Sequence, residues 1–276
     1  MPMIKQNAPI GVYDSGVGGL SVLRAIHSQL PLETTLYFAD QAKVPYGERP
    51  LEEVRTLAEG VTRMMMDEGA KLIVIACNTA SAAALKYLRA LYPEFPFVGM
   101  EPAVKPAAEQ TLSGKVGVLA TPSTFHGELY ASVVERFAKE VRIFEATCPG
   151  LVRQIERGYL QTPVTWRILQ QALEPMLAEG VDTLVMGCTH FPFVIPLIQK
   201  IAGDGVRVID PAPAIARQTE RVLLQHELLR TAVSDVPHRF LTSGNPARFS
   251  HLLAQLLHVE AKAEKWQWVG NSLRRG

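Results

Sequence analysis

The chain has few cysteines, almost no net charge and no long run of apolar residues. Its 276 residues include three cysteines, too few for the disulfide framework that holds small secreted domains together. A net charge of +1 provides no basic surface suited to nucleic acid or to an anionic membrane. The longest apolar runs, such as residues 72–77, are far too short to cross a bilayer.

Several common site motifs are also missing. No CxxC or HxxxH spacing indicates a zinc site. The Gly-rich stretch 15–19 does not match GxGxxG and is followed by no P-loop lysine, so it does not indicate a nucleotide site. Its backbone N–H groups suit a carboxylate or phosphate, although a plain strand-to-helix turn has the same pattern. Residues 1–9 lack the apolar core of a signal peptide, so we expect a cytoplasmic protein with reduced thiols.

Two stretches repeat one pattern around a cysteine. Residues 68–81 (EGAKLIVIACNTAS) and 179–192 (EGVDTLVMGCTHFP) each begin with Glu-Gly and reach a cysteine, Cys77 or Cys188, after an apolar run. Such a run after a glycine turn predicts a strand buried on both faces of a parallel sheet. Each cysteine is therefore expected at the carboxyl end of a central strand, the edge at which α/β sheets bind ligands.

Weaker echoes extend this repeat along the chain. Residues 10–15 resemble 116–121, and residues 98–103 resemble 208–212, in the same order and at nearly the same offset as the cysteines. Matches in one order at one offset indicate an internal duplication of about a domain's length.

The expected fold is α/β, with two pseudo-symmetric parallel-sheet domains and the active site at their interface. The first domain would comprise residues 1–99 and 210–276, and the second residues 100–209. Proline-rich crossings near 101–107 and 211–213 would join them. The apolar periodicity predicts strands over 10–14, 36–40, 97–100, 116–120, 141–145, 206–209 and 240–244 in addition to the two cysteine strands. It predicts helices over 20–30, 50–68, 80–91, 127–140, 151–159, 165–179, 193–201, 215–229 and 247–257, with Asn78, Thr79 and Ser81 available to cap the third.

Two thiols facing each other across a domain interface suit one reaction in particular. A thiolate on one face of a tetrahedral carbon can remove a proton while a thiol on the other face supplies one, which inverts the centre. A thiol has a reference pKa of about 8.5, close enough to neutral pH to act in both directions. Asp14 and Asp40 end strands expected beside Cys77 and could shuttle its proton. His190 and Glu156 could serve Cys188.

Other interpretations of the cysteines remain open. A buried cysteine in a strand is most often a small hydrophobic residue, and we assign Cys148, which has no echo, to that class. Cys77, Cys148, Cys188 and His190 have the residue types of a zinc site, and Cys77 with Cys188 could form a redox disulfide.

The chain resembles the glutamate racemases of the cofactor-independent aspartate/glutamate racemase superfamily over nearly its whole length. The matching motifs are DSGVGGLSV at 14–22, VPYGER at 44–49, ACNTAS at 76–81, EPAVKPA at 101–107, GVLAT at 117–121, VDTLVMGCTHFP at 181–192 and FLTSGNPARF at 240–249.

The resemblance implies interconversion of L- and D-glutamate for peptidoglycan in a bacterial cytoplasm. It also implies a homodimer that uses no cofactor, neither pyridoxal phosphate nor metal. The catalytic residues it implies are Cys77, Cys188, Asp14, His190, Glu156 and Asp40. The substrate-binding residues it implies are Asp14, Ser15, Pro45, Tyr46, Gly47, Asn78, Thr79, Thr121, Thr189 and His190.

Two rival functions remain to be separated. One is a racemase for aspartate or another acidic substrate on the same scaffold. The other is a non-catalytic protein that binds a carboxylate in the same cleft. Comparing the turnover of L-aspartate with that of L-glutamate distinguishes a glutamate racemase from the first rival. Exchange of the α-proton with solvent distinguishes a racemase from the second rival, the binding protein.

Overall fold

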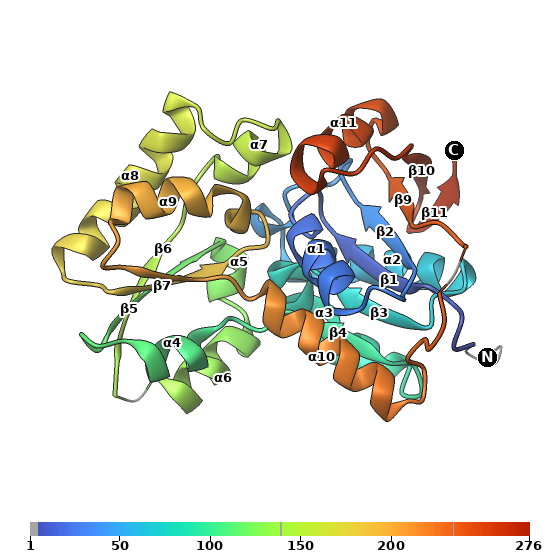
Figure 1. The fold of residues 1–276 in the computed structure, drawn as a ribbon, viewed down its shortest axis with the longest axis horizontal. Coiled ribbons are helices and arrows are strands. Elements are labelled where there is room, and N and C mark those ends of the chain that lie inside the picture. Colours follow the sequence, from blue (N-terminus) through green and yellow to red (C-terminus); the bar gives the residue numbers. More distant parts are fainter. Residues whose placement is uncertain (1–4, 139, 234) are drawn as a thin grey trace.

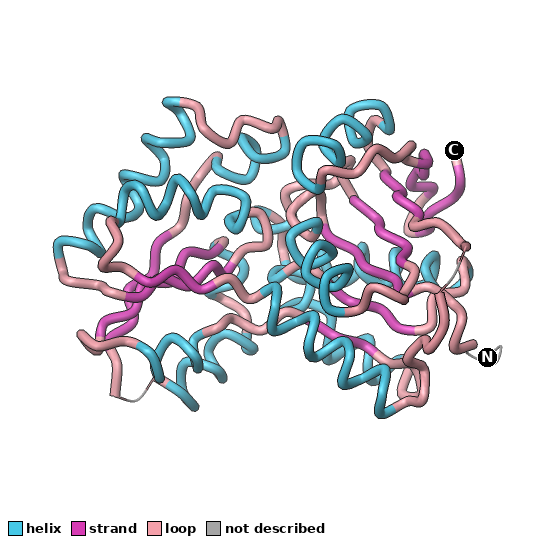
Figure 2. Tube along the Cα trace, in the orientation of Figure 1, coloured by secondary structure: helices cyan, strands magenta, loops and turns pink. Residues whose placement is uncertain are grey.

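The computed structural model describes residues 5–138, 140–233 and 235–276. The strands of these residues form two sheets, each enclosed by helices in its own lobe (Figures 1 and 2). Residues 1–4, position 139 in the predicted helix 127–140, and position 234 in the C-terminal part lie outside the described residues.

The first lobe contains the C-terminus and a seven-stranded sheet in the order β11-β10-β9-β2-β1-β3-β4. Its strands are β1 (Ile10–Asp14), β2 (Thr35–Ala39), β3 (Leu72–Ile75), β4 (Phe97–Gly99), β9 (Arg239–Thr242), β10 (Glu264–Val269) and β11 (Ser272–Arg275). Its helices are α1 (Leu20–Gln29), η1 (Tyr46–Glu48), α2 (Leu51–Asp67), α3 (Asn78–Leu91), α10 (Ala212–Gln225) and α11 (Pro246–Leu257). Pairing is parallel except between β10 and β11.

The second lobe contains a parallel four-stranded sheet in the order β6-β5-β7-β8. Its strands are β5 (Lys115–Ala120), β6 (Arg142–Ala146), β7 (Thr183–Gly187) and β8 (Arg207–Ile209). Its helices are α4 (Val104–Gln110), α5 (Pro122–Phe125), α6 (Glu128–Phe137), α7 (Leu151–Glu156), α8 (Pro163–Ala178), η2 (Phe191–Val194) and α9 (Ile195–Ala202).

The two sheets share one topology. The order β2-β1-β3-β4 in the first lobe matches β6-β5-β7-β8 in the second, strand for strand along the chain. In both copies a glycine with positive φ, Gly69 or Gly180, lies between the preceding helix and the cysteine strand. This φ explains the repeated Glu-Gly, since glycine adopts it without a steric penalty.

The chain passes from one lobe to the other at both predicted proline-rich crossings, and each of these segments also contains the first turn of a helix. The segment 101–107 contains the start of α4, with Pro106 in its first turn, and the segment 211–213 leads into α10. Proline is tolerated there because the first N–H groups of a helix have no partner inside the helix. The predicted helix over 127–140 corresponds to α6, which begins at Glu128 and ends at Phe137, and the short helix α5 that precedes it was not predicted.

The predicted helix over 215–229 is displaced towards the N-terminus. It begins at Ala212 and ends at Gln225, and Glu227 then has φ +56°. The last seventeen residues hold the hairpin of β10 and β11, which the periodicity did not predict.

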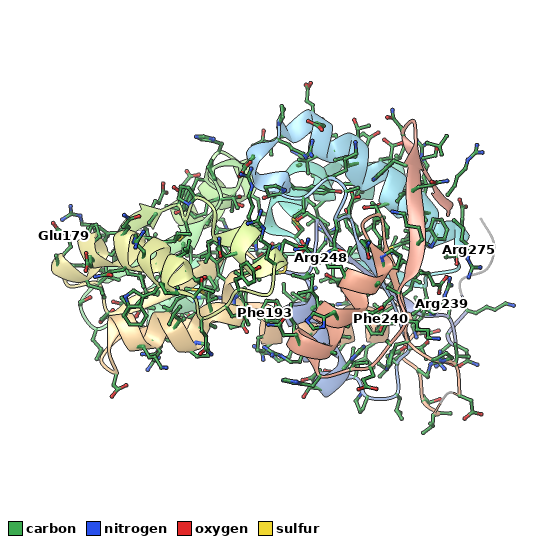
Figure 3. All side chains as sticks on the ribbon, turned by 90° about the horizontal axis from the view of Figure 1, so that it is seen from above. Glu179, Phe193, Arg239, Phe240, Arg248 and Arg275 are labelled. Atoms are coloured by element: carbon green, nitrogen blue, oxygen red, sulfur yellow. The ribbon has the colours of Figure 1, made fainter. Side chains whose placement is uncertain are left out.

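One apolar core continues from the first lobe into the second. It joins residues of α1, α10 and α11 to residues of α7, α8 and β7. Two further clusters fill the remaining faces, one between the first sheet and α2 and α3, the other between the second sheet and α4 and α6. Figure 3 shows Glu179 at the far end of one lobe, Arg275 at the far end of the other, and Phe193 and Arg248 near their junction. The shared core holds the carboxyl edges of the two sheets against each other.

Candidate active site

The two motif cysteines line one cavity, as the sequence predicts. Cys77 follows β3 and Cys188 follows β7, and both are buried, with 5% and 6% of their surfaces exposed. About 280 Å³ in and around this cavity is free of protein atoms, a volume that includes the open solvent at its mouth. Besides the two cysteines, its lining includes all of the predicted substrate-binding residues except Asp14: Ser15, Pro45, Tyr46, Gly47, Asn78, Thr79, Thr121, Thr189 and His190.

Cys77 itself caps helix α3. Its backbone is extended, and its Sγ accepts a hydrogen bond of 3.4 Å from the N–H of Ala80. The helix therefore begins at Asn78, two residues earlier than predicted, and the predicted caps serve other purposes. Ser81, for example, donates to the carbonyl of Ile75 and accepts from the N–H of Met100. A sulfur at a helix N-terminus lies where the helix dipole stabilises negative charge.

The surroundings of Cys77 nevertheless favour its neutral thiol. Burial raises the pKa of Cys77 well above its ordinary value, and the nearby Asp14 carboxylate raises it further. Asp14 is fully buried, and burial raises its pKa as well. Asp14 Oδ2 accepts from the N–H groups of Gly16 and Gly19 at 3.4 and 2.9 Å. Asp14 is not among the residues that line the cavity, so the structure places it behind Cys77.

Cys188 is joined to a buried histidine and a buried glutamate. Its Sγ is 3.9 Å from His190 Nδ1, and His190 Nε2 is 2.7 Å from Glu156 Oε1. Burial opposes a charge on the imidazole, but the bonds with Cys188 and Glu156 outweigh it and raise the pKa of His190 well above its ordinary value. The structure therefore brings together Cys188, His190 and Glu156, as the sequence predicts.

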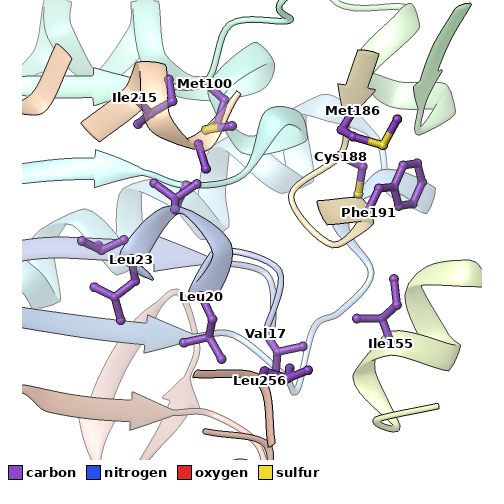
Figure 4. Close-up of a cluster of buried hydrophobic side chains, with 14 of the residues drawn as sticks. Val17, Leu20, Leu23, Met100, Ile155, Met186, Cys188, Phe191, Ile215 and Leu256 are labelled. Carbon is purple, nitrogen blue, oxygen red and sulfur yellow. The ribbon is translucent and has the colours of Figure 1, made fainter. Parts of the chain in front are cut away.

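The glycine-rich turn between β1 and α1 allows Glu156 and His190 to pack closely against the first lobe. A methyl group at Gly16 would overlap the Glu156 carboxylate, and one at Gly18 would overlap the His190 ring. The N–H of Val17 donates to Glu156 Oε1 at 2.7 Å. Three N–H groups of the turn, from Gly16, Val17 and Gly19, thus bind carboxylates of the protein itself. Figure 4 shows the apolar neighbours of this contact, with Val17 below Cys188 and Ile155 on the facing helix.

Asp40 occupies a different position from the one predicted for a proton shuttle. It is fully buried at the end of β2 and accepts from the Tyr46 hydroxyl, the Ser243 hydroxyl and the Trp268 indole. Among the described residues its side chain has these three partners, and none is Cys77. Burial raises its pKa, and the same three donors oppose that shift. The arrangement holds Tyr46, which lines the cavity, and a catalytic role for Asp40 stays a prediction.

Polar groups on the other wall of the cavity come from both lobes. Thr79 Oγ1 and Thr121 Oγ1 are 3.1 Å apart, and Thr121 Oγ1 is 3.0 Å from Thr124 Oγ1. Within the described residues, neither side-chain polar atom of Asn78 has a hydrogen-bond partner. A buried amide without partners costs about 1–3 kcal/mol, so this one is suited to a ligand in the cavity.

The alternatives for the cysteines differ in their fit to this geometry. All three cysteines are free thiols, so Cys77 and Cys188 form no disulfide in this structure. No group of three or more His, Cys, Asp or Glu side chains in the described parts of the chain is arranged to hold a metal ion. Cys148 is buried, and burial raises the pKa of its thiol to about 12, which suits the structural role predicted for it.

Sequence reasoning missed several residues that shape the site. Thr124, Val152 and Gly187 line the cavity with the predicted set. Gln41 Nε2 donates to Glu156 Oε2 at 3.0 Å, and Trp268 reaches Asp40 from the C-terminal hairpin. A signal existed for Thr124, because the TPSTF turn has hydroxyls where the first copy has an acid and glycines. Gly187 lies in the repeated motif directly before Cys188, and no local pattern indicates Val152, Gln41 or Trp268.

Comparisons with known proteins place this geometry among racemases. The Asp/Glu/Hydantoin racemase family model matches residues 10–219. The glutamate racemase of Ectopseudomonas mendocina is 50% identical over 260 residues, which cover 94% of this chain and 98% of that protein.

Solved structures agree with this relationship. A glutamate racemase isoform from Bacillus anthracis superposes with a TM-score of 0.86 at 32% identity, covering 94% of this chain and 97% of that one. The Escherichia coli glutamate racemase, solved with L-glutamate and an activator, superposes with a TM-score of 0.83 at 32% identity, covering 95% of this chain and 100% of that one. These likenesses confirm the predicted two-lobed α/β fold.

Proposed function

The chain belongs to the Asp/Glu/hydantoin racemase family, and on that basis we propose that it is an isomerase that interconverts L- and D-glutamate without a cofactor. The observation that carries the proposal is the pair of thiols, Cys77 and Cys188, which reach one cavity from the carboxyl ends of equivalent strands. Two acid/base groups on opposite sides of a carbon are what inversion by proton exchange requires.

The reaction consists of two proton transfers. The thiolate of one cysteine removes the α-proton of glutamate and becomes a thiol, leaving the electron pair delocalised into the α-carboxylate. The thiol of the other cysteine then gives its proton to the opposite face of the carbon and becomes a thiolate. The product has the inverted configuration, and the two cysteines have exchanged their protonation states.

The environments of the cysteines suggest how the protons are distributed before the reaction. His190, held by Glu156, lies beside Cys188 and can exchange a proton with its thiol. The buried Asp14 carboxylate favours the neutral thiol at Cys77. This asymmetry provides one base and one acid in the same cavity, and the opposite assignment follows each turnover.

The substrate carboxylates and amine are assigned to the polar lining. Donors and acceptors come from both lobes: the amide of Asn78, which has no partner among the described residues, the hydroxyls of Thr79, Thr121 and Thr189, and the backbone at Ser15 and Tyr46–Gly47. A dicarboxylate amino acid matches this set because both of its ends carry charge. The same polar lining would hold an aspartate, which is shorter by one methylene.

Replacement of each motif cysteine tests the assigned roles. Cys77→Ser and Cys188→Ser should each reduce racemisation of L-glutamate at least about 1,000-fold, because a serine hydroxyl is a far weaker acid than a thiol. Cys148→Ser is the matched control and should retain activity. Near-wild-type turnover by either motif variant, measured by chiral chromatography, would rule out the two-thiol reaction.

The rival substrate is tested in the same assay. Turnover of L-aspartate should be at least about 100-fold slower than that of L-glutamate if the cavity is matched to the longer side chain. Comparable turnover of both would favour an aspartate or broad-specificity racemase. Tight binding of L-glutamate without turnover would favour a non-catalytic binding protein.

The cellular role follows from the reaction and stays part of the proposal. D-glutamate is a constituent of peptidoglycan, so the activity would supply cell-wall synthesis in a bacterial cytoplasm by a homodimer. None of the helices in the described residues combines the length and apolarity needed to cross a bilayer. On the grounds of the duplication, we propose two domains, one of residues 1–99 and 210–276 and one of residues 100–209. Each of the two sheets lies within one of these domains.

A further inference from the structure

The C-terminal hairpin is an addition to the duplicated sheet. Strands β10 and β11 extend the first sheet beyond β9 and have no counterpart in the second sheet, whose four described strands repeat only β1–β4. The hairpin also lies beyond residues 10–219, which match the family model. It nevertheless reaches the side chains that support the candidate active site.

A chain of hydrogen bonds leads from the hairpin to the cavity lining. The indole Nε1 of Trp268 donates to Asp40 Oδ1 at 2.8 Å. The other carboxylate oxygen, Oδ2, accepts from the Tyr46 hydroxyl at 2.6 Å. Tyr46 is buried, and it lines the cavity together with Pro45 and Gly47. One carboxylate thus joins the hairpin to the loop that faces the substrate.

A second contact from the hairpin reinforces the first. Lys265 Nζ donates to the carbonyls of Ser243 and Gly244 at 2.6 and 2.7 Å. The Ser243 hydroxyl in turn donates to Asp40 Oδ1 at 2.6 Å. Two of the three donors on the Asp40 carboxylate are therefore provided or held by β10.

Helix α2 has a glycine where the hairpin approaches it. A methyl group at Gly60 would lie 2.7 Å from the Trp268 ring and 2.7 Å from the carbonyl oxygen of Asn271. Glycine inside a helix destabilises it by roughly 1 kcal/mol relative to alanine, so its presence here has a local reason. The missing side chain allows the indole to reach Asp40.

We propose that Trp268 is a positioning residue of the active site, which holds Asp40 so that its carboxylate fixes Tyr46 and the substrate-facing backbone of Tyr46–Gly47. The inference rests on the proposed racemase function, because it assigns that loop to substrate binding. Trp268 lies behind the lining, touches no reacting atom and acts on glutamate affinity rather than on proton transfer.

The same strand contains a matched control. Trp266 lies two residues before Trp268, so both side chains extend from the same face of β10. Trp266 is buried, and its Nε1 has no hydrogen-bond partner among the described residues. Replacement of either tryptophan by phenylalanine removes the same atoms, but only at position 268 does it remove a donor to Asp40.

The test compares steady-state kinetics of the full-length variants with L-glutamate. Trp268→Phe should raise KM about threefold to thirtyfold, because only part of the effect of the lost hydrogen bond reaches the substrate through Asp40 and Tyr46, while kcat changes less than about twofold. Trp266→Phe should leave both constants near the wild-type values. Equal kinetic constants for the two variants would overturn the proposal, as would a fall in kcat at Trp268→Phe with KM unchanged.

A double-mutant cycle distinguishes positioning from general loss of stability. Tyr46→Phe removes the other end of the chain, so Trp268→Phe should have little further effect on KM when combined with it. If the increases in KM caused by the two single substitutions multiplied in the double variant, Trp268 would not act through Asp40 and Tyr46. If Trp268→Phe does not fold, Gly60→Ala replaces it in the test, since the added methyl displaces the indole. It should raise KM in the same way, and an unchanged KM would overturn the proposal.

The outcome also separates this inference from the proposed function. If the wild-type protein does not racemise L-glutamate, the proposed function fails and the loop loses its assignment. If the wild type racemises L-glutamate and Trp268→Phe behaves like Trp266→Phe, the function stands and the positioning role is wrong.

Discussion

At the scale of single residues, replacement of Asn78 should weaken substrate binding without lowering the stability of the fold. Its amide lies in the cavity with no partner among the described residues, so the folded protein already bears the cost of burying it. Asn78→Ala should therefore leave the free energy of unfolding within about 1 kcal/mol of wild type while it raises KM for glutamate roughly tenfold. Urea denaturation and steady-state kinetics on the same preparation measure the two effects.

Ser81 provides the opposite control on the same helix. Its hydroxyl has two backbone partners, Ile75 and Met100, and is not part of the cavity lining. Ser81→Ala should lower the free energy of unfolding by about 1–2 kcal/mol and leave KM unchanged. A loss of stability at Asn78→Ala equal to that at Ser81→Ala would show that the amide is satisfied in the absence of substrate.

The charge on His190 makes a second prediction at this scale. Despite its burial, the bonds with Cys188 and Glu156 raise its pKa, so the folded protein retains the proton to higher pH than the unfolded chain, where the pKa is about 6.5. The stabilisation is complete below about pH 6.5 and is lost as pH rises through the folded pKa. The difference in unfolding free energy between wild type and His190→Asn should shrink over that window. Urea denaturation across a pH series measures it, and a difference that grows as pH rises towards about 6.5 and stays constant above it would show that His190 is neutral in the folded protein.

Residue types and spacing in the sequence predicted the residues that line the cavity better than the residues that support this lining from behind. Cys77, Cys188 and the hydroxyls lie in repeated motifs at strand ends, so position alone indicates them. Trp268 is 228 residues from Asp40 in the chain, and no local pattern records that they meet. Contacts of this kind depend on which strands become neighbours, which periodicity does not determine.

At the scale of elements, the β1–α1 turn determines how closely the lobes approach. Gly16→Ala would insert a methyl group into the Glu156 carboxylate and break its alignment with His190. We expect activity to fall about 10- to 100-fold, with a lower melting temperature, as measured by racemisation and thermal unfolding. Gly205→Ala is the control, because a methyl group there meets no atom within 4 Å. If Gly16→Ala retained the activity of Gly205→Ala, the turn would have no part in holding the Glu156–His190 pair.

The errors in the predicted elements have local physical causes. The starts of α4 and α10 were not predicted because each contains proline in its first turn, and proline both begins helices and interrupts them. The C-terminal hairpin contains a two-residue turn, Gly270-Asn271, of a type that favours tight hairpins. The sequence therefore contains a local signal for this hairpin, which the apolar periodicity alone does not reveal.

At the scale of the whole molecule, the duplication explains why the reaction can run in both directions. The two sheets have one strand order, and the cysteines follow equivalent strands, β3 and β7. Repeated motifs predicted this architecture because each copy retained its glycine turn, apolar strand and cysteine. The shared core that joins the lobes was not predictable, since it depends on side chains from α1, α7 and α8 that meet only in the folded chain.

The most direct test of the two-thiol reaction is solvent exchange at the α-carbon. Wild-type protein is incubated with L-glutamate in deuterated buffer, and the optical rotation is followed together with the α-proton signal by NMR. Two opposed thiols predict that rotation decays while deuterium enters the α-carbon, appearing first in D-glutamate, because the proton leaves to one cysteine and the deuteron arrives from the other. Loss of rotation with the α-proton retained in D-glutamate, or no change in either signal, would contradict the reaction.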